Sequence, residues 1–150
     1  MQNNFSVINK TKSKLPSLPL LKLKNDILGK KYSLSIAFVN KNKSQEINKK
    51  YRNKDKPTNI LSFELSKNEG EIILCPALIK TEAKDFSRTF AEFIGFLVIH
   101  GMLHLKGFEH SSTMERAEEK YDQKYFSRNR CGILDYEDRR GRILQRRKKS

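Results

Sequence analysis

The stretch FAEFIGFLVIHGMLHL, at residues 90–105, decides the fold because it is apolar nearly all round. A helix with apolar side chains on every face is normally buried inside a protein. The charge-free part of this stretch, Phe93 to Leu105, has 13 residues and contains two histidines, so it is too short to span a bilayer. We therefore expect a central buried helix around which the other elements pack.

The segments before this helix have the patterns of strands. Tyr32 to Phe38 alternates larger apolar side chains with small ones, which is the period of a strand with one buried face. Asn59 to Leu65 and Glu71 to Cys75 are apolar segments joined by the polar turn Ser66 to Gly70, and they predict an antiparallel hairpin. Phe5 to Ile8 predicts one further short strand.

Four more segments have helical patterns. Leu18 to Leu28 has loose helical spacing, Ser44 can cap a helix that runs to about Tyr51, and Pro76 suits the first turn of a helix that ends near Phe86. The sequence STME at residues 112–115 has the form of a capping box. The helix that follows it carries one apolar stripe, which holds Met114, Ala117, Tyr121 and Tyr125. The order of elements predicts an α+β domain, with a small mixed β-sheet of about four strands packed with about five helices.

Length and charge indicate one domain and a polyanionic partner. The chain has 150 residues, which we divide into a domain at residues 1–136 and a basic C-terminal tail at residues 137–150. Its 31 Lys and Arg against 17 Asp and Glu give a net charge of +14, which favours nucleic acid as the partner. The tail holds seven of these basic residues and few apolar ones, so we expect it to be loosely ordered and to add affinity for RNA of any sequence.

The cysteines and the N-terminus argue against a secreted protein. Cys75 and Cys131 lie 56 positions apart, which fits neither a zinc ribbon nor a disulfide framework. Residues 1–14 are polar and lack the apolar core of a signal peptide. We expect a soluble protein of a reducing compartment, the cytoplasm, without a membrane partner.

The three histidines of the chain all lie in the sequence HGMLHLKGFEH, at residues 100–110. His100 and His104 are four residues apart on the predicted helix, so their imidazoles share one face. Gly107 can end the helix in the left-handed conformation and let the chain bring His110 back as a third ligand. Three neutral imidazoles suit one zinc ion per chain and leave a fourth position open to water. The spacing predicts a zinc site on the central helix.

The same histidine spacing occurs in metzincin peptidases, where a Glu follows the first histidine and acts as the general base. Gly101 occupies that position here and cannot transfer a proton, which argues against a zinc peptidase. A second alternative is a nucleic-acid-binding factor without catalytic activity, whose zinc is structural. Structural zinc sites usually have four protein ligands, so three histidines favour a catalytic ion over this alternative.

Three blocks of sequence resemble the YbeY family of bacterial endoribonucleases, which act in ribosomal RNA maturation. HGMLHLKGFEH at residues 100–110 looks like the family's HGxLHLxGYDH, and YRNKDKPTNILSF at residues 51–63 is similar to its YRxKDxPTxVLSF. GEIILC at residues 70–75 resembles its GDxxIC strand, and the order and spacing of the blocks also agree over residues 32–127. The chain differs from the signature at Phe108 and Glu109, where the family usually has Tyr and Asp.

The resemblance implies a hydrolase with an identifiable site. It implies His100, His104 and His110 as zinc ligands and Arg52 as the catalytic arginine, which would hold a phosphate of single-stranded RNA. The implied partners are ribosomal RNA and the small ribosomal subunit, with a role in maturation of the 3′ end of 16S rRNA and in ribosome quality control. With this resemblance, the alternative without catalytic activity becomes a ribosome-assembly RNA-binding factor with structural zinc. The general base stays open between a zinc-activated water and Glu109, and the RNA 2′-hydroxyl is an alternative nucleophile to water.

Overall fold

The computed structural model describes residues 4–126, 134–137 and 143–146, with side chains for residues 4–126. Four strands form one sheet: β1 (Phe5–Asn9), β2 (Ser33–Phe38), β3 (Ile60–Ser66) and β4 (Glu69–Leu74). Their order in the sheet is β1-β2-β4-β3. β1 and β4 pair with β2 in parallel, and β3 pairs with β4 in an antiparallel hairpin, so the sheet is mixed as predicted.

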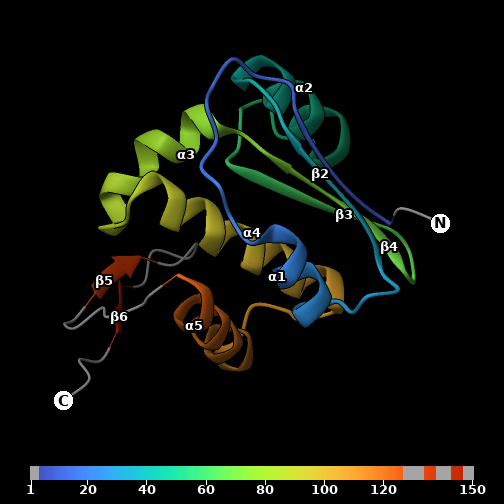
Figure 1. The fold of residues 1–150 in the computed structure, drawn as a ribbon. Coiled ribbons are helices and arrows are strands. Elements are labelled where there is room, and N and C mark those ends of the chain that lie inside the picture. Colours follow the sequence, from blue (N-terminus) through green and yellow to red (C-terminus); the bar gives the residue numbers. More distant parts are fainter. Residues whose placement is uncertain (1–3, 127–133, 138–142, 147–150) are drawn as a thin grey trace.

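The described residues also form five α-helices (Figure 1). They are α1 (Leu20–Ile27), α2 (Lys41–Arg52), α3 (Pro76–Glu82), α4 (Phe90–Lys106) and α5 (Ser112–Tyr125), and a short 3₁₀ turn, η1 (Ala83–Phe86), follows α3. Figure 1 shows α4 running through the middle of the molecule, with α1 and α5 beside it. The predicted α+β class is confirmed, and so is the central helix, whose residues Phe93, Ile94, Val98 and Ile99 are buried.

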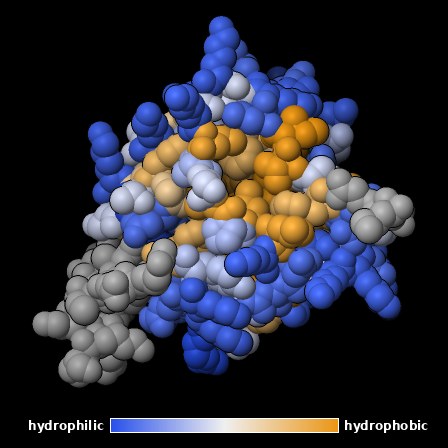
Figure 2. All heavy atoms as spheres, viewed as in Figure 1, coloured by the Kyte–Doolittle hydropathy of each residue, from blue (hydrophilic) through white to orange (hydrophobic). Residues whose placement is uncertain are grey.

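The two faces of the sheet have different coverings. Ile36 and Ile72 belong to a large core that includes residues of α1 and α4, whereas Leu61 and Ile73 belong to a smaller cluster with Ile47 of α2. Successive side chains of a strand point to opposite faces, so α4 and α2 lie on opposite sides of the sheet. Figure 2 shows apolar side chains in the middle of the side seen in Figure 1, with hydrophilic residues around them.

Capping residues define both ends of α4. Thr89 is its N-cap and forms a capping box with Glu92, in which each side chain bonds the backbone of the other residue. Gly107 ends the helix with φ of 110°, a left-handed conformation in which other residues are strained. The predicted helix end at Gly107 is confirmed, while the capping box at Thr89 was not foreseen from the sequence.

Three local details differ from the sequence-based expectation. Asn40, rather than Ser44, caps α2, because its side chain accepts a hydrogen bond from the Lys43 amide at 2.8 Å. Ser111, one residue earlier than expected, caps α5 through the Met114 amide. The β3–β4 turn contains only residues 67 and 68, because pairing continues to Ser66 and Glu69 through a bulge. Each shift moves a boundary by a few residues and leaves the element in place.

A second, two-stranded sheet forms near the C-terminus. β5 (Leu134–Glu137) pairs antiparallel with β6 (Ile143–Arg146). The expectation of a tail without regular structure is therefore wrong for these strands, because the few apolar residues at positions 143 and 144 pair with a partner segment upstream. The expected domain boundary at residue 136 falls within β5, and the remaining tail residues lie outside the described ranges.

α5 is joined to the start of α4 by a buried ion pair. The Arg88 guanidinium donates two hydrogen bonds to the Asp122 carboxylate, each 3.2 Å long. The two side chains are 1% and 0% exposed, and the Arg88 guanidinium also lies over the Phe96 ring. This bidentate geometry fixes the position of α5 on α4 at a point where neither charge meets water.

A lysine is buried where α1 ends. The Lys24 ammonium donates a hydrogen bond of 2.9 Å to the carbonyl of Lys30, and desolvation by burial lowers the pKa of Lys24. The helical spacing of residues 18–28 does not predict a buried lysine. Leu21, an apolar residue of the same helix, is half exposed.

No single helix within the described ranges is long and apolar enough to cross a membrane. Two consecutive segments, Pro76–Phe86 and Phe90–Lys106, reach that length and composition only together, across a bend of 103°.

Candidate metal centre

The three histidines come together in space at the C-terminal end of α4. His100 and His104 lie one turn apart on the helix, and His110 returns from the segment that follows Gly107. One ring nitrogen from each histidine lies within 4.8 Å of the others. His100 is buried, His104 is half-buried and His110 is exposed. The predicted clustering is confirmed, and one side of the group is open to solvent.

Hydrogen bonds orient the two helical imidazoles. The Nδ1 of His104 donates to the backbone carbonyl of Phe108 at 3.1 Å, and the Nδ1 of His100 donates to the carboxylate of Glu118. A carbonyl and a carboxylate can only accept hydrogen bonds, so the proton of each ring is placed on Nδ1.

The opposite nitrogens of these rings therefore present lone pairs to each other. The Nε2 atoms of His100 and His104 are 3.1 Å apart. Two ligand nitrogens of a tetrahedral zinc ion with bonds of about 2.0–2.1 Å are separated by about 3.4 Å. Facing lone pairs at such a distance repel unless a cation lies between them, so the donor set fits a metal ion.

Glu118 is the residue of this centre that sequence reasoning missed. It lies on α5, is buried, and bonds the Nδ1 of His100. Histidine ligands of metals commonly donate their second ring proton to a carboxylate, which orients the ring and raises its basicity. A signal was present in the sequence, because Glu118 is four residues from Met114 and three from Tyr121, on the stripe predicted to be apolar.

Gly101 is required by close packing between α4 and the sheet. A Cβ atom at this position would lie 2.9 Å from the hydroxyl of Ser62 and 3.1 Å from the side chain of Ile60. A side chain at this position would require Ser62, Ile60 and Ile72 to shift, and a glutamate would need the most space. The packing gives a physical reason why the peptidase base is absent at this position.

Glu109, the candidate base, lies beside the histidines in sequence and is exposed. Its backbone carbonyl accepts a hydrogen bond from Ser111 at 3.1 Å. Within the described part of the chain, its carboxylate forms no hydrogen bond or ion pair, so no contact orients it toward the metal centre.

Arg52 is the last residue of α2, where it is exposed. It forms no hydrogen bond or ion pair with the histidines among the described residues, and α2 covers the side of the sheet opposite α4. The role of Arg52 in binding a phosphate therefore stays a prediction.

Buried polar residues of α2 hold the loop that follows Arg52. The hydroxyl of Ser44 donates to the carbonyl of Thr58 and accepts from its amide, at 2.8 and 2.9 Å. The amide of Asn48 donates to the carbonyl of Lys56 at 2.8 Å. These bonds explain why Ser44 and Asn48 are buried, and they give the basic loop at residues 53–59 a defined position.

Comparison with known proteins agrees with this arrangement. The family model described as Endoribonuclease YbeY matches residues 3–128. A protein named Endoribonuclease YbeY from Staphylococcus carnosus is 42% identical, over 68% of this chain and 70% of that protein. A protein of the same name from Francisella tularensis subsp. novicida is 36% identical, over 75% of this chain and 79% of that protein. The solution structure of TM1509 from Thermotoga maritima is similar with a TM-score of 0.58 and 26% identity, over 80% of this chain and 87% of that one. The three converging histidines thus occur on a sequence and fold that are both shared with these proteins, and the chain belongs to the Endoribonuclease YbeY family.

Proposed function

We propose that this protein is a zinc-dependent endoribonuclease that cuts single-stranded RNA during ribosomal RNA maturation in the cytoplasm. The observation that carries the proposal is the convergence of three histidine nitrogens within 4.8 Å in a chain of the Endoribonuclease YbeY family. The resemblance noted in the sequence extends the proposal to the 3′ end of 16S rRNA, to the small ribosomal subunit as partner and to ribosome quality control.

His100, His104 and His110 would hold the zinc ion. When bound, zinc supplies a Lewis acid that neutralises charge on a phosphate oxygen and lowers the pKa of a water molecule. Glu118 and the carbonyl of Phe108 keep the Nε2 atoms of His100 and His104 pointed at the ion. The exposure of His110 leaves the RNA free to approach from the solvent side.

Arg52 would bind a phosphate of the RNA. Its guanidinium can form two parallel hydrogen bonds to phosphate oxygens, and such contacts stabilise charge that develops during cleavage. The net charge of +14 supports a polyanionic substrate, because cations along the path of the RNA release counterions when it binds.

Cleavage of a labelled single-stranded RNA tests this function directly. We expect the purified protein to cut it, EDTA to stop the reaction, and added zinc to restore it. A duplex of the same sequence should be cut much more slowly. Binding of RNA without any cleavage, in the presence of zinc, would instead favour an assembly factor with a structural metal.

Replacing Glu118 with Gln should weaken zinc binding by about 10- to 100-fold, the usual cost of losing a residue that orients a metal ligand. The variant keeps the size of the side chain but loses its charge. Competition with a chromophoric chelator measures the affinity. The matched control is Glu119→Gln, since Glu119 is the exposed neighbour on the same helix and should bind zinc as the wild type does. Equal affinities in the two variants would remove Glu118 from the metal centre.

Replacing Arg52 with Ala should reduce RNA cleavage on the order of a hundredfold, because a charged contact to the reacting phosphate is lost. Zinc content and the circular dichroism spectrum should not change, since Arg52 is exposed and forms no hydrogen bond or ion pair with the histidines among the described residues. Lys54→Ala removes a nearby exposed cation and should have a much smaller effect. Cleavage at the wild-type rate by Arg52→Ala would exclude Arg52 from the mechanism.

A further inference from the structure

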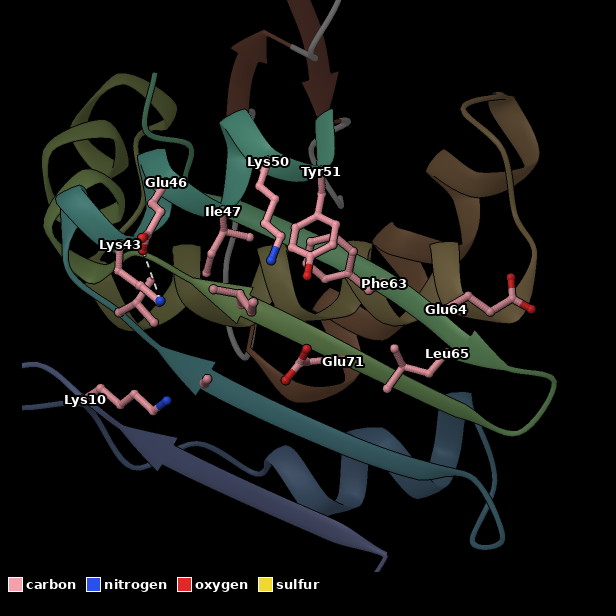
Figure 3. Close-up of a pocket in the computed structure, with 13 residues that line it drawn as sticks. Lys10, Lys43, Glu46, Ile47, Lys50, Tyr51, Phe63, Glu64, Leu65 and Glu71 are labelled. Carbon is pink, nitrogen blue, oxygen red and sulfur yellow. Dashed lines mark ion pairs between the residues drawn. The ribbon is translucent and has the colours of Figure 1, made fainter. Parts of the chain in front are cut away.

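A groove of about 570 Å³ lies between α2 and the face of the sheet that α4 does not cover. Figure 3 shows Lys50 and Tyr51 extending from α2 toward the strands, with Phe63, Leu65 and Glu71 on the strands below them. Residues of α2 line it on one side and residues of the strands on the other. The histidine centre does not line it.

Two aromatic rings form one wall of the groove. The rings of Tyr51 and Phe63 meet edge to face, with their centroids 5.2 Å apart. Tyr51 is nonetheless 61% exposed, which is unusual for a large apolar ring in contact with the protein surface. Phe63 supports the Tyr51 ring from one side, so the ring is held in position while much of it still faces solvent.

The charges along the groove are unevenly distributed. Of the charged residues that line the groove, Lys43, Glu46 and Lys50 belong to α2, and Glu46 pairs with Lys43 at 3.0 Å. Glu64 and Glu71 line the groove from the strands, and Lys10 lines it directly after β1. Among the described lining residues of α2, Lys50 is therefore the cation that no acid pairs with, and it can attract a phosphate to that side of the groove.

Lys50 lies next to the aromatic wall. Its ammonium is 5.2 Å from the centre of the Tyr51 ring. Among the described residues it has no acidic partner, so it is available to a phosphate adjacent to a base on that ring. An exposed aromatic ring beside cations is the arrangement with which proteins bind unpaired nucleotides, because every base has a face that can stack.

We propose that Tyr51, supported by Phe63, is a stacking site for an unpaired base of RNA, with the adjacent phosphate on the Lys50 side of the groove. The proposal rests on the proposed function for the identity of the ligand as RNA. It adds a binding site on the face of the sheet opposite α4, and this site sets a preference for single strands, because a base within a duplex cannot expose its face to Tyr51.

Binding of a short fluorescein-labelled single-stranded RNA, followed by anisotropy with EDTA present to prevent cleavage, tests this site. Tyr51→Ala should bind about 5- to 150-fold more weakly than the wild type, which is the range for losing one stacked base. Tyr51→Phe keeps the ring and should bind within about twofold of the wild type. The matched control is Leu65→Ala, because Leu65 lines the same groove and is similarly exposed, at 58%, but has no aromatic face.

An oligomer of the same length without bases separates stacking from other effects. Wild type and Tyr51→Ala should bind this abasic strand equally, since no base is present to stack. A Tyr51→Ala variant that binds normal RNA as the wild type does would overturn the proposal, and the groove would then be open to a protein partner instead.

The outcomes also separate this site from the proposed function. Tyr51-dependent RNA binding in a protein that cuts no RNA with zinc present would support the stacking site and contradict the nuclease. Cleavage by the wild type together with unchanged binding in Tyr51→Ala would support the nuclease and contradict the stacking site. A wild type that does not bind RNA at all would contradict both.

Discussion

His104→Ala is expected to lose bound zinc almost completely and, with it, RNA cleavage. His104 is the middle member of the histidine group, and its Nε2 lies 3.1 Å from that of His100. Two remaining imidazoles, one of them on an exposed segment, are too few ligands for a stable zinc site, which usually has three or four. Zinc per chain, measured by plasma emission after gel filtration, should fall from about one to near zero.

The control for this change is Glu109→Gln, in the segment that carries His110. Glu109 is exposed and has no side-chain contact among the described residues, so its replacement should leave the zinc content at about one per chain. The unfolding temperature of metal-free His104→Ala should match that of the metal-free wild type, because the change removes only a half-buried ring. Zinc at the wild-type level in His104→Ala would show that the ligand assignment is wrong.

Asp122→Ala is expected to destabilise the fold by about 3–5 kcal/mol, which is the cost of leaving a buried charge without its partner. The Arg88 guanidinium is 1% exposed and would keep its charge at every accessible pH. For a domain of this size, such a loss lowers the unfolding temperature on the order of 10 °C. Thermal unfolding followed by circular dichroism measures the effect.

Two further variants test whether the lost stability of Asp122→Ala comes from the unpaired charge of Arg88 or from the loss of packing. The double change Arg88→Met with Asp122→Leu removes both charges and keeps apolar volume, so it should regain most of the stability. Glu46→Ala breaks the pair with Lys43, which has a similar separation of 3.0 Å but is exposed, and should leave the unfolding temperature almost unchanged. A loss of stability in Glu46→Ala equal to that in Asp122→Ala would mean that burial is not the cause.

The features that could be predicted from the sequence depend on patterns within one segment. The length and apolar character of residues 90–105 predicted α4, and the i, i+4 spacing of His100 and His104 placed both rings on one face of it. Gly107 predicted the left-handed helix end that lets His110 return. Period-two alternation predicted β2 within one residue.

The features that could not be predicted depend on contacts between distant segments. Glu118 meets His100 and Asp122 meets Arg88 only because α5 packs against α4, and no spacing within α5 identifies those partners. The sequence suggests that Ser44 caps a helix, whereas in the structure its hydroxyl bonds the carbonyl of Thr58, in a loop 14 residues away. The pairing of β5 with β6 was missed because each strand is short and has too few apolar residues to show a pattern alone.

The strand order β1-β2-β4-β3 also has a consequence for how the chain folds. Only the β3–β4 pairing is local, since two residues separate these strands, whereas β2 must reach β4 across α2 and the whole of β3. Closing a long loop costs more entropy than closing a short hairpin, so local pairs form first. We expect the hairpin to form early, with α4 condensing onto it, and the parallel strands β2 and β1 to join afterwards. Assembly of the sheet would then begin at the β3 edge, against which Gly101 of α4 packs, and end at the opposite edge with the segment that is first in the sequence.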